Sequence, residues 1–154
     1  MKKLKSKQVK KINKTPQKKL QKKAESLWKE VCLLRDKRKC QVKQMFPGVK
    51  IPHSNVIQVD HCFSRSNKNL FLQISNGTTV CSTCNMMKKN GLKGVDLLIY
   101  EIVSRREGVD RFMEMRELHQ SGGANISWNK VWWLEEQIDI LETIKRGMTG
   151  GIYE

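Results

Sequence analysis

The sequence lacks any apolar run of about 18 residues, the length that a membrane-spanning helix needs. Its basic N-terminus also lacks the apolar stretch of a secretory signal. It contains no internal repeat. We therefore expect a protein with no membrane segment that stays in the cytoplasm, where it is made.

The cysteine content argues against a disulfide framework. The chain has five cysteines, an odd number, and two of them lie in Cys81-Ser82-Thr83-Cys84. The two-residue spacing of that pair is typical of metal knuckles. A reducing compartment therefore fits the cysteines better than an oxidising one.

Size and charge limit the possible functions. With 154 residues, 38% of them hydrophobic, the chain can form one globular domain of ordinary size with a tail. Its 30 Lys and Arg against 15 Asp and Glu give a formal net charge of +15. This balance favours a polyanionic partner, with DNA or RNA as the first candidate. Cationic proteins also bind acidic membranes, and many basic surfaces are only solvated, so charge alone does not decide.

The positive charge is concentrated at the N-terminus. Residues 1–23 contain eleven lysines and no acid, which is +11 and leaves +4 for residues 24–154. The lysine charges repel one another, so this segment should not fold alone, and we predict a basic disordered arm over residues 1–15. It is either a solvated tail or a source of sequence-independent DNA affinity through counterion release. In the second case the candidate contacts include Lys18, Lys19, Lys22 and Lys23.

A helix should follow the arm, over residues 16–36. Thr15 and Pro16 resemble an N-cap and a first helical residue. Apolar residues then recur at helical spacing to about Arg35, namely Leu20, Ala24, Leu27, Trp28, Val31 and Leu34. We interpret this stripe as a face that docks on a core, and Trp28 as a core aromatic.

The middle of the chain predicts two short strands and a helix. Turn signals before residue 56 are followed by the β-favouring run Val56–Val59, which would deliver Asp60 and His61. Residues 62–75 should form a loop, Thr78–Val80 a second strand, and Cys84 the start of a helix.

The C-terminal region, residues 93–154, should be helical. One helix carries Val95, Leu98, Ile99 and Ile102 and ends at Gly108, and a shorter one begins with the core positions Val109, Phe112 and Met113. After the break at Gly122-Gly123, Ser127 can cap a last helix. Its apolar positions, Val131, Leu134, Ile138 and Leu141, suit helix pairing, either inside one subunit or in a homodimer.

One group of polar residues has the types and spacing of a catalytic site. Asp60-His61 ends the first strand, Asn76 lies five residues before Cys81, and Asn85 directly follows Cys84. This pattern closely resembles the HNH, or ββα-metal, endonucleases over residues 35–90. The stretch from Arg35-Asp36 to Cys40 and the helical tail resemble phage NinG-type recombination endonucleases more weakly. The resemblance implies an α+β fold, mainly helical, with an HNH hairpin-plus-helix core over residues 37–92, and an activity on branched or recombination DNA.

The chemistry of these side chains suits phosphodiester hydrolysis independently of the resemblance. An imidazole with a pKa near 6.5 can deprotonate water, which makes His61 a candidate general base. A divalent cation such as Mg²⁺ takes oxygen ligands, which Asp60 and Asn85 can supply. Adjacent residues of a strand point to opposite sides, so Asp60 and His61 could face metal and water separately if the backbone turns sharply there. The resemblance assigns the same roles.

Three further assignments each have an alternative. By resemblance, Asn76 is the middle residue of the HNH signature and braces the loop that carries His61, although Asn76-Gly77 is also an ordinary turn pair. Lys88 and Lys89, on the first turns of the helix, could contact phosphates beside the cut, or could be solvated surface lysines. Arg65 is a further candidate nucleic-acid contact.

Cys81 and Cys84 are spaced like half of a structural zinc site. In many of the HNH proteins that the chain resembles, a second Cys-x-x-Cys pair upstream completes this site. Cys40 stands where that pair should begin, but position 43 is lysine, so the fourth ligand that the resemblance implies is missing. His53, in a loop that could fold back over the knuckle, ranks before Cys62 and Cys32 as its replacement. Alternatively, the cysteines are small buried residues in a site that has lost its zinc.

Two classes of function therefore compete. The first is a metal-dependent DNA endonuclease with catalytic Mg²⁺ and structural Zn²⁺. The second is a non-catalytic zinc module that binds DNA or RNA. Asn85 favours the first, because a pure zinc knuckle needs neither that amide nor an acid beside the histidine.

Overall fold

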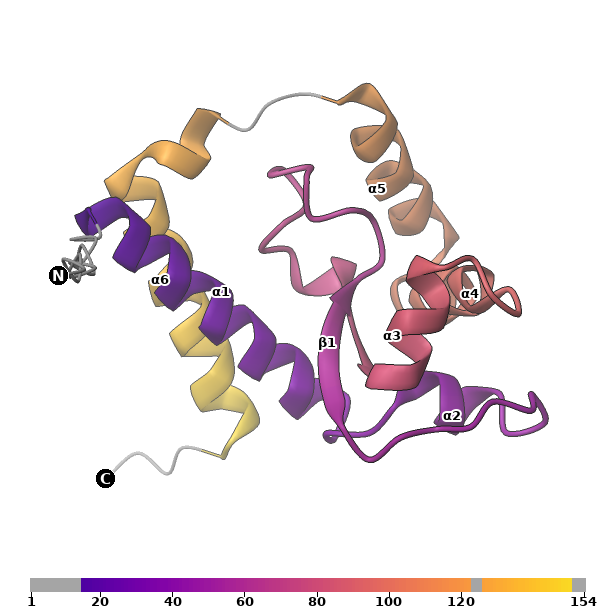
Figure 1. The fold of residues 1–154 in the computed structure, drawn as a ribbon. Helices are drawn as coiled ribbons and strands as arrows, with labels where there is room; N and C mark the ends of the chain where they lie inside the picture. Colours follow the sequence, from indigo (N-terminus) through magenta and orange to yellow (C-terminus); the bar gives the residue numbers. More distant parts are fainter. Residues whose placement is uncertain (1–14, 123–125, 151–154) are drawn as a thin grey trace, which may run out of the picture.

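The computed structural model describes residues 15–122 and 126–150. Over these residues the chain forms α1 (Pro16–Arg35), α2 (Gln41–Met45), β1 (Ile57–His61), the 3-10 helix η1 (Ile74–Asn76), β2 (Gly77–Cys81), α3 (Ser82–Lys89), α4 (Val95–Glu107), α5 (Val109–Ser121), the 3-10 helix η2 (Ile126–Asn129) and α6 (Val131–Met148). Figure 1 shows α1 and α6 side by side on one side of β1, with α3, α4 and α5 on the other. The predicted α+β class, mainly helical with one small hairpin, is confirmed.

The predicted first helix is confirmed, and it provides half of the first core. Ala24, Trp28 and Val31 of α1 are fully buried. They pack with Phe71 and Leu72 of the loop after β1 and with Ile138 and Leu141 of α6. Three of the four predicted stripe positions of α6, Leu134, Ile138 and Leu141, are thus buried within the chain, whereas Val131 is 43% exposed. The packing of α6 on α1 accounts for most of the helix-pairing spacing within one subunit.

The two strands pair antiparallel, with Asp60 opposite Thr78 and His61 opposite Gly77. Alternation along the strands therefore sends the side chains of Asp60 and His61 to opposite faces of the sheet. The His61 face lies against α1, because a Cβ at Gly77 would be 2.4 Å from the Cys32 sulfur and 2.8 Å from the Trp28 ring. Glycine is required at position 77 by this close approach, and its φ of −91° is ordinary.

The other face of the hairpin covers a second core that includes α2 to α5. Its buried apolar residues include Val42, Phe63, Leu70, Val80, Val95, Ile99, Ile102, Val103 and Met115. The predicted core stripe of α4 is therefore largely right, with Leu98 packed only at its edge.

A buried ion pair fastens α1 to the hairpin. The Arg35 guanidinium donates to the Asp36 carboxylate at 2.8 Å and to the Gly77 carbonyl at 2.7 Å. The same carboxylate accepts the Thr79 backbone N–H at 2.9 Å. Burial alone would raise the pKa of Asp36, but Arg35 and the Thr79 N–H lower it below its usual range. These contacts fix the strand that leads into Cys81.

Three local predictions were wrong. Helix α3 begins at Ser82, before Cys84, so Lys88 and Lys89 lie on its last turn. Helix α5 is as long as α4, at 13 residues. Val109 and Met113 are 66% and 41% exposed, and Met115 is the buried residue of α5.

The ends of the helices also bear on earlier expectations. Lys130 is the N-cap of α6, whereas the predicted cap Ser127 lies inside η2.

The predicted disordered arm, apart from Thr15, lies outside the described residues. Among the described helices, none combines the length and apolar character needed to cross a membrane.

Candidate functional site

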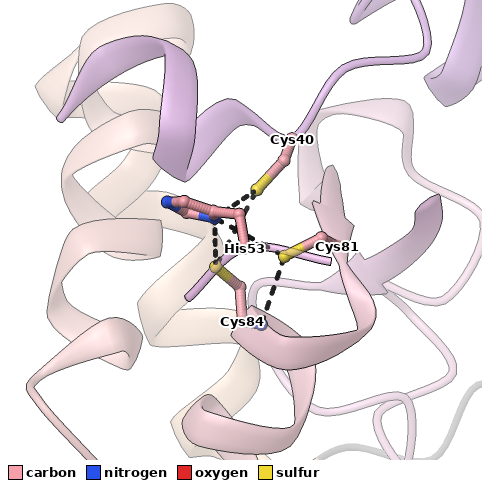
Figure 2. A group of neighbouring side chains, drawn as sticks. All are labelled: Cys40, His53, Cys81 and Cys84. Carbon is pink, nitrogen blue, oxygen red and sulfur yellow. Dashed lines mark hydrogen bonds between the residues drawn. The ribbon is translucent and has the colours of Figure 1, made fainter. Parts of the chain in front are cut away.

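The first candidate site is a group of four residues that could hold a metal ion. Cys40 is the N-cap of α2, Cys81 that of α3, and Cys84 lies in the first turn of α3. His53 comes from the loop before β1, as the sequence predicted. Figure 2 shows the His53 ring and the three sulfurs pointing toward one another, with all four ligand atoms within 4.8 Å.

The distances match a tetrahedral zinc site. Zinc bonds of about 2.3 Å to sulfur and about 2.0–2.1 Å to nitrogen put two ligand sulfurs about 3.8 Å apart, and a nitrogen about 3.6 Å from a sulfur. The Cys40 and Cys84 sulfurs are 3.8 Å apart. His53 Nδ1 lies 3.8, 3.5 and 3.4 Å from the sulfurs of Cys40, Cys81 and Cys84. These four ligand-atom pairs are therefore close to the spacing that one ion requires, and the remaining two sulfur pairs lie within 4.8 Å.

The electrostatics also favour a cation. Burial raises the pKa of Cys84, and the neighbouring Cys40 raises it further, because a second thiolate would be repelled by the first. Burial would raise the pKa of Cys81 too, but hydrogen bonds from the Cys84 backbone N–H, His53 and the Ser54 backbone lower it to about 6. One thiolate is thus accommodated, and a divalent cation would allow the others to ionise.

The two lower-ranked ligand candidates lie elsewhere. Cys32 is buried beside Gly77, and burial raises its pKa to about 12. Cys62 is 2% exposed, and burial raises its pKa to about 12 as well. These two cysteines are small buried residues of the core.

The second candidate site surrounds the end of β1. The Asp60 carboxylate forms an ion pair with Lys88 Nζ at 2.5 Å, and both side chains are only 17% exposed. The same ammonium donates to the His61 carbonyl. Lys88 was predicted as a phosphate contact, but here it neutralises Asp60.

His61 is more enclosed than the sequence suggested. It is 7% exposed, and its ring stacks on Trp28 at 4.2 Å and on Phe71 at 4.9 Å between centroids. Its Nε2 lies 3.0 Å from the Phe71 carbonyl, which can only accept, so Nε2 carries the proton and Nδ1 keeps the lone pair. Burial lowers the pKa of His61 to about 4, so the ring is neutral at pH 7.

Asn76 makes the bracing contacts expected of it. Its side-chain oxygen accepts the Phe63 N–H at 2.8 Å, and its amide nitrogen donates to the carbonyls of Phe63 and Leu70, each at 3.1 Å. The turn-pair alternative is wrong, because Asn76 ends η1 and Gly77 begins β2. Asn76 therefore ties together both ends of the loop after His61.

Two side-chain oxygens near Asp60 are buried without a hydrogen-bond partner among the described residues: Thr78 Oγ1 and Asn85 Oδ1. Thr78 faces Asp60 across the strands. Asn85 lies three residues before Lys88 on α3, so the two share the helix face that reaches Asp60. Unsatisfied buried oxygens beside a carboxylate are chemically suited to a hard divalent cation.

A cavity of about 400 Å³ brings five predicted site residues together: Asp60, His61, Arg65, Lys88 and Lys89. Asn85 does not contribute to its lining. The other walls include Asp96 and Tyr100 of α4 and His119 of α5. The lining therefore combines two acidic residues, Asp60 and Asp96, and two histidines, His61 and His119, with three cationic residues.

No family model, curated protein or solved structure matches this chain.

The four candidate lysines on α1 lie apart from this cavity's lining. Lys18, Lys19, Lys22 and Lys23 are all exposed on the first turns of α1. Lys23 forms an ion pair with Glu142 of α6 at 2.8 Å.

Some residues of the site had no signal in the sequence. Phe71 orients His61 through a backbone carbonyl, which any residue could supply. Tyr100 and His119 belong to helices whose apolar spacing indicated only a core. Trp28 could be predicted as buried, but its stacking on His61 depends on how α1 crosses the sheet.

Proposed function

We propose that the chain is a metal-dependent endonuclease of the HNH type that hydrolyses DNA phosphodiester bonds, with a structural zinc ion at Cys40, His53, Cys81 and Cys84. The observation that carries the proposal is one cavity whose lining includes Asp60 and His61 together with three cationic residues, and also Asp96 and His119. A phosphodiester needs a base for water, a ligand for a cation and positive charge for its oxygens. Those are the groups that line this cavity.

The zinc group and the cavity are joined through α3. Cys81 and Cys84 hold the start of the helix, and Lys88 at its end reaches Asp60. A two-stranded hairpin is marginally stable in water, so an ion bound at this joint would stabilise the frame that positions the cavity. Zinc in this role is structural.

The catalytic cation would be held by Asp60 and Asn85, with Thr78 able to contribute its hydroxyl. The fit rests on the two buried oxygens that lack partners and on the carboxylate opposite one of them. When bound, Mg²⁺ would neutralise charge on the leaving oxygen. Lys88 must release the Asp60 carboxylate for the cation to enter, and its ammonium then becomes available to a phosphate oxygen.

His61 would accept the proton of the attacking water at Nδ1. The Phe71 carbonyl holds the opposite nitrogen protonated, which fixes the tautomer that this role needs. A pKa of about 4 makes the free ring a weak base. A bound phosphate would raise that pKa, because negative charge beside the ring stabilises its protonated form.

The second candidate function, a non-catalytic zinc module that binds nucleic acid, is favoured by one observation. His61 stacks on two aromatic rings, those of Trp28 and Phe71, and so has a clear structural role. The Cys40, His53, Cys81 and Cys84 group would serve either function.

The deciding experiment is nicking of supercoiled plasmid in Mg²⁺ and in EDTA, with Asp60→Asn and His61→Gln compared at equal folded fraction. The nuclease should lose about 10²- to 10⁴-fold in single-turnover rate when His61 is replaced, while DNA binding persists. Asp60→Asn should instead raise the Mg²⁺ concentration needed for cutting. Near-wild-type cutting by folded His61→Gln would refute the assigned base, and no cutting by the wild-type chain on plasmid or four-way-junction DNA would leave the binding module.

A further inference from the structure

A second cavity adjoins the one at Asp60 and His61. It has a volume of about 390 Å³ and lies between α4 and α5, which Figure 1 shows next to each other. Its lining includes Phe63, Leu97, Tyr100, Phe112, Arg116 and His119. Tyr100 and His119 also line the first cavity, so the two cavities are neighbours with these side chains in common.

The wall of this second cavity is aromatic. The Phe63 ring lies 5.6 Å from the Tyr100 ring at 24°, 5.4 Å from the Phe112 ring and 5.5 Å from the His119 ring. Tyr100 and Phe112 meet at 61°, so together they form an angled surface rather than a flat stack. Such a surface offers ring faces to a small planar ligand.

The polar groups of the cavity indicate that the ligand is not purely apolar. Exposed Arg116 adds a cation to the lining. His119 Nδ1 is buried with no hydrogen-bond partner among the described residues. A volume near 390 Å³ is at the small end of the range for ligand pockets, about 300–1,000 Å³.

The position of the aromatic wall is fixed relative to His61 by the backbone and by hydrogen bonds. Phe63 is two residues after His61, and both its N–H and its carbonyl are held by the Asn76 side chain. A ligand on the Phe63 wall therefore has a fixed position relative to the first cavity. A strand with its phosphate in the first cavity would bring a neighbouring base to the second.

We propose that the cavity between α4 and α5 binds one unstacked nucleobase of the DNA strand whose phosphate lies at Asp60 and His61. The proposal rests on the proposed function and specifies its substrate, a strand with an unpaired base beside the cut. Aromatic rings stack on any base, so the cavity selects for accessibility of the base more than for its identity. A base inside a continuous duplex would have to leave the stack, which costs free energy.

The test uses a short single-stranded oligonucleotide with one 2-aminopurine, bound to the full zinc-loaded chain in buffer without Mg²⁺, so that cleavage is not required. Fluorescence of 2-aminopurine falls when the base stacks on an aromatic ring. The wild-type chain should quench it saturably, and Tyr100→Leu should bind about 5- to 150-fold more weakly, the range for loss of one base-aromatic stack. Tyr100→Phe should retain the quenching, because it keeps the ring.

Two controls make the result specific. Met113→Leu changes an exposed residue of α5 outside the cavity lining and should behave as wild type. Phe112→Leu provides a second lining variant if Tyr100→Leu does not fold. A fully paired duplex with the same 2-aminopurine should be quenched much less.

The proposal would be overturned if Tyr100→Leu and Phe112→Leu quench the fluorescence as strongly as the wild type does, or if the wild type does not quench it. Equal quenching of the duplex and the single strand would also overturn it. The nicking assay fails or succeeds separately. A chain that nicks plasmid without ring-dependent quenching keeps the nuclease and loses the base pocket, and the reverse result keeps the pocket and loses the nuclease.

Discussion

The ion pair between Asp60 and Lys88 leads to the most specific prediction about the cavity, that replacing Lys88 with Met tightens binding of a divalent cation. The two charged atoms are 2.5 Å apart, and each side chain is only 17% exposed. At an effective dielectric constant near 20 their gross attraction is about 7 kcal/mol, most of which is offset by lost hydration. A charged hydrogen bond of this kind retains a net value of about 1.5–3 kcal/mol.

A cation that takes the Asp60 carboxylate must first break this ion pair. Without the Lys88 ammonium that cost disappears, so the dissociation constant should fall by roughly 10- to 150-fold. The metal-free Lys88→Met chain should also be less stable than wild type, because the Asp60 charge is left half-buried and unpaired. Added cation should restore its melting temperature more than that of the wild type.

The assay is titration of zinc-loaded protein with Mn²⁺ as a Mg²⁺ substitute, following the electron paramagnetic resonance signal of free Mn²⁺. Lys89→Met is the matched control, because Lys89 lines the same cavity but is exposed and is the next residue along α3. It removes the same charge without removing the Asp60 ion pair. If both methionine variants change Mn²⁺ affinity equally, or if Lys88→Met weakens it, Lys88 does not compete with the cation for Asp60.

Three further predictions concern the frame around the cavity. Gly77→Ala should destabilise the fold by about 1–3 kcal/mol in urea melts. Adding Cys32→Ala should recover only part of this loss, because the new methyl group would meet both the Cys32 sulfur and the Trp28 ring. Equal losses with and without Cys32→Ala would contradict the packing described. Purified protein should contain about one zinc per chain, and Cys84→Ser should lose it with a lower melting temperature, whereas a zinc-free chain whose melting is unaffected by chelator would refute the metal site. In buffer without Mg²⁺, protonation of His61 should penalise the folded state increasingly as the pH falls from about 6.5 to about 4, because the unfolded ring binds its proton first. The stability advantage of wild type over His61→Gln should therefore shrink by up to about 3 kcal/mol, and a pH-independent difference would argue against a buried neutral ring.

Much of the fold could be predicted because its elements are encoded locally. The stripe from Leu20 to Leu34 specifies α1, with Pro16 at its start, and the short β-favouring runs specify the two strands to within two residues. The errors fall where local signals are weak. Ser127 is a good capping residue, yet α6 starts three residues later than that cap would place it, and Met113 has the correct spacing for a core that Met115 occupies instead. Tertiary packing overrides a capping preference of about 1 kcal/mol.

The candidate site divides in the same way. The motif identified Asp60 and His61 of the cavity lining, because adjacent acidic and histidine residues are distinctive, and the candidate nucleic-acid contacts added Arg65, Lys88 and Lys89. Asn85 of the motif lies outside the lining. The sequence also placed His53 first as the missing zinc ligand, but its spacing alone could not separate it from Cys62 and Cys32. That choice depends on the path of the loop before β1.

The sequence by itself therefore determined the helices, the hairpin, the Cys81–Cys84 pair and the residue types of the proposed phosphodiester site. Only the tertiary structure decided which of these groups meet. It placed Trp28 against His61, Lys88 on Asp60, and Tyr100 and His119 between two cavities. Helix and strand preferences act over a few neighbouring residues, whereas these contacts join segments up to about sixty residues apart. They are set by how whole faces pack against the hairpin, and no local pattern records that.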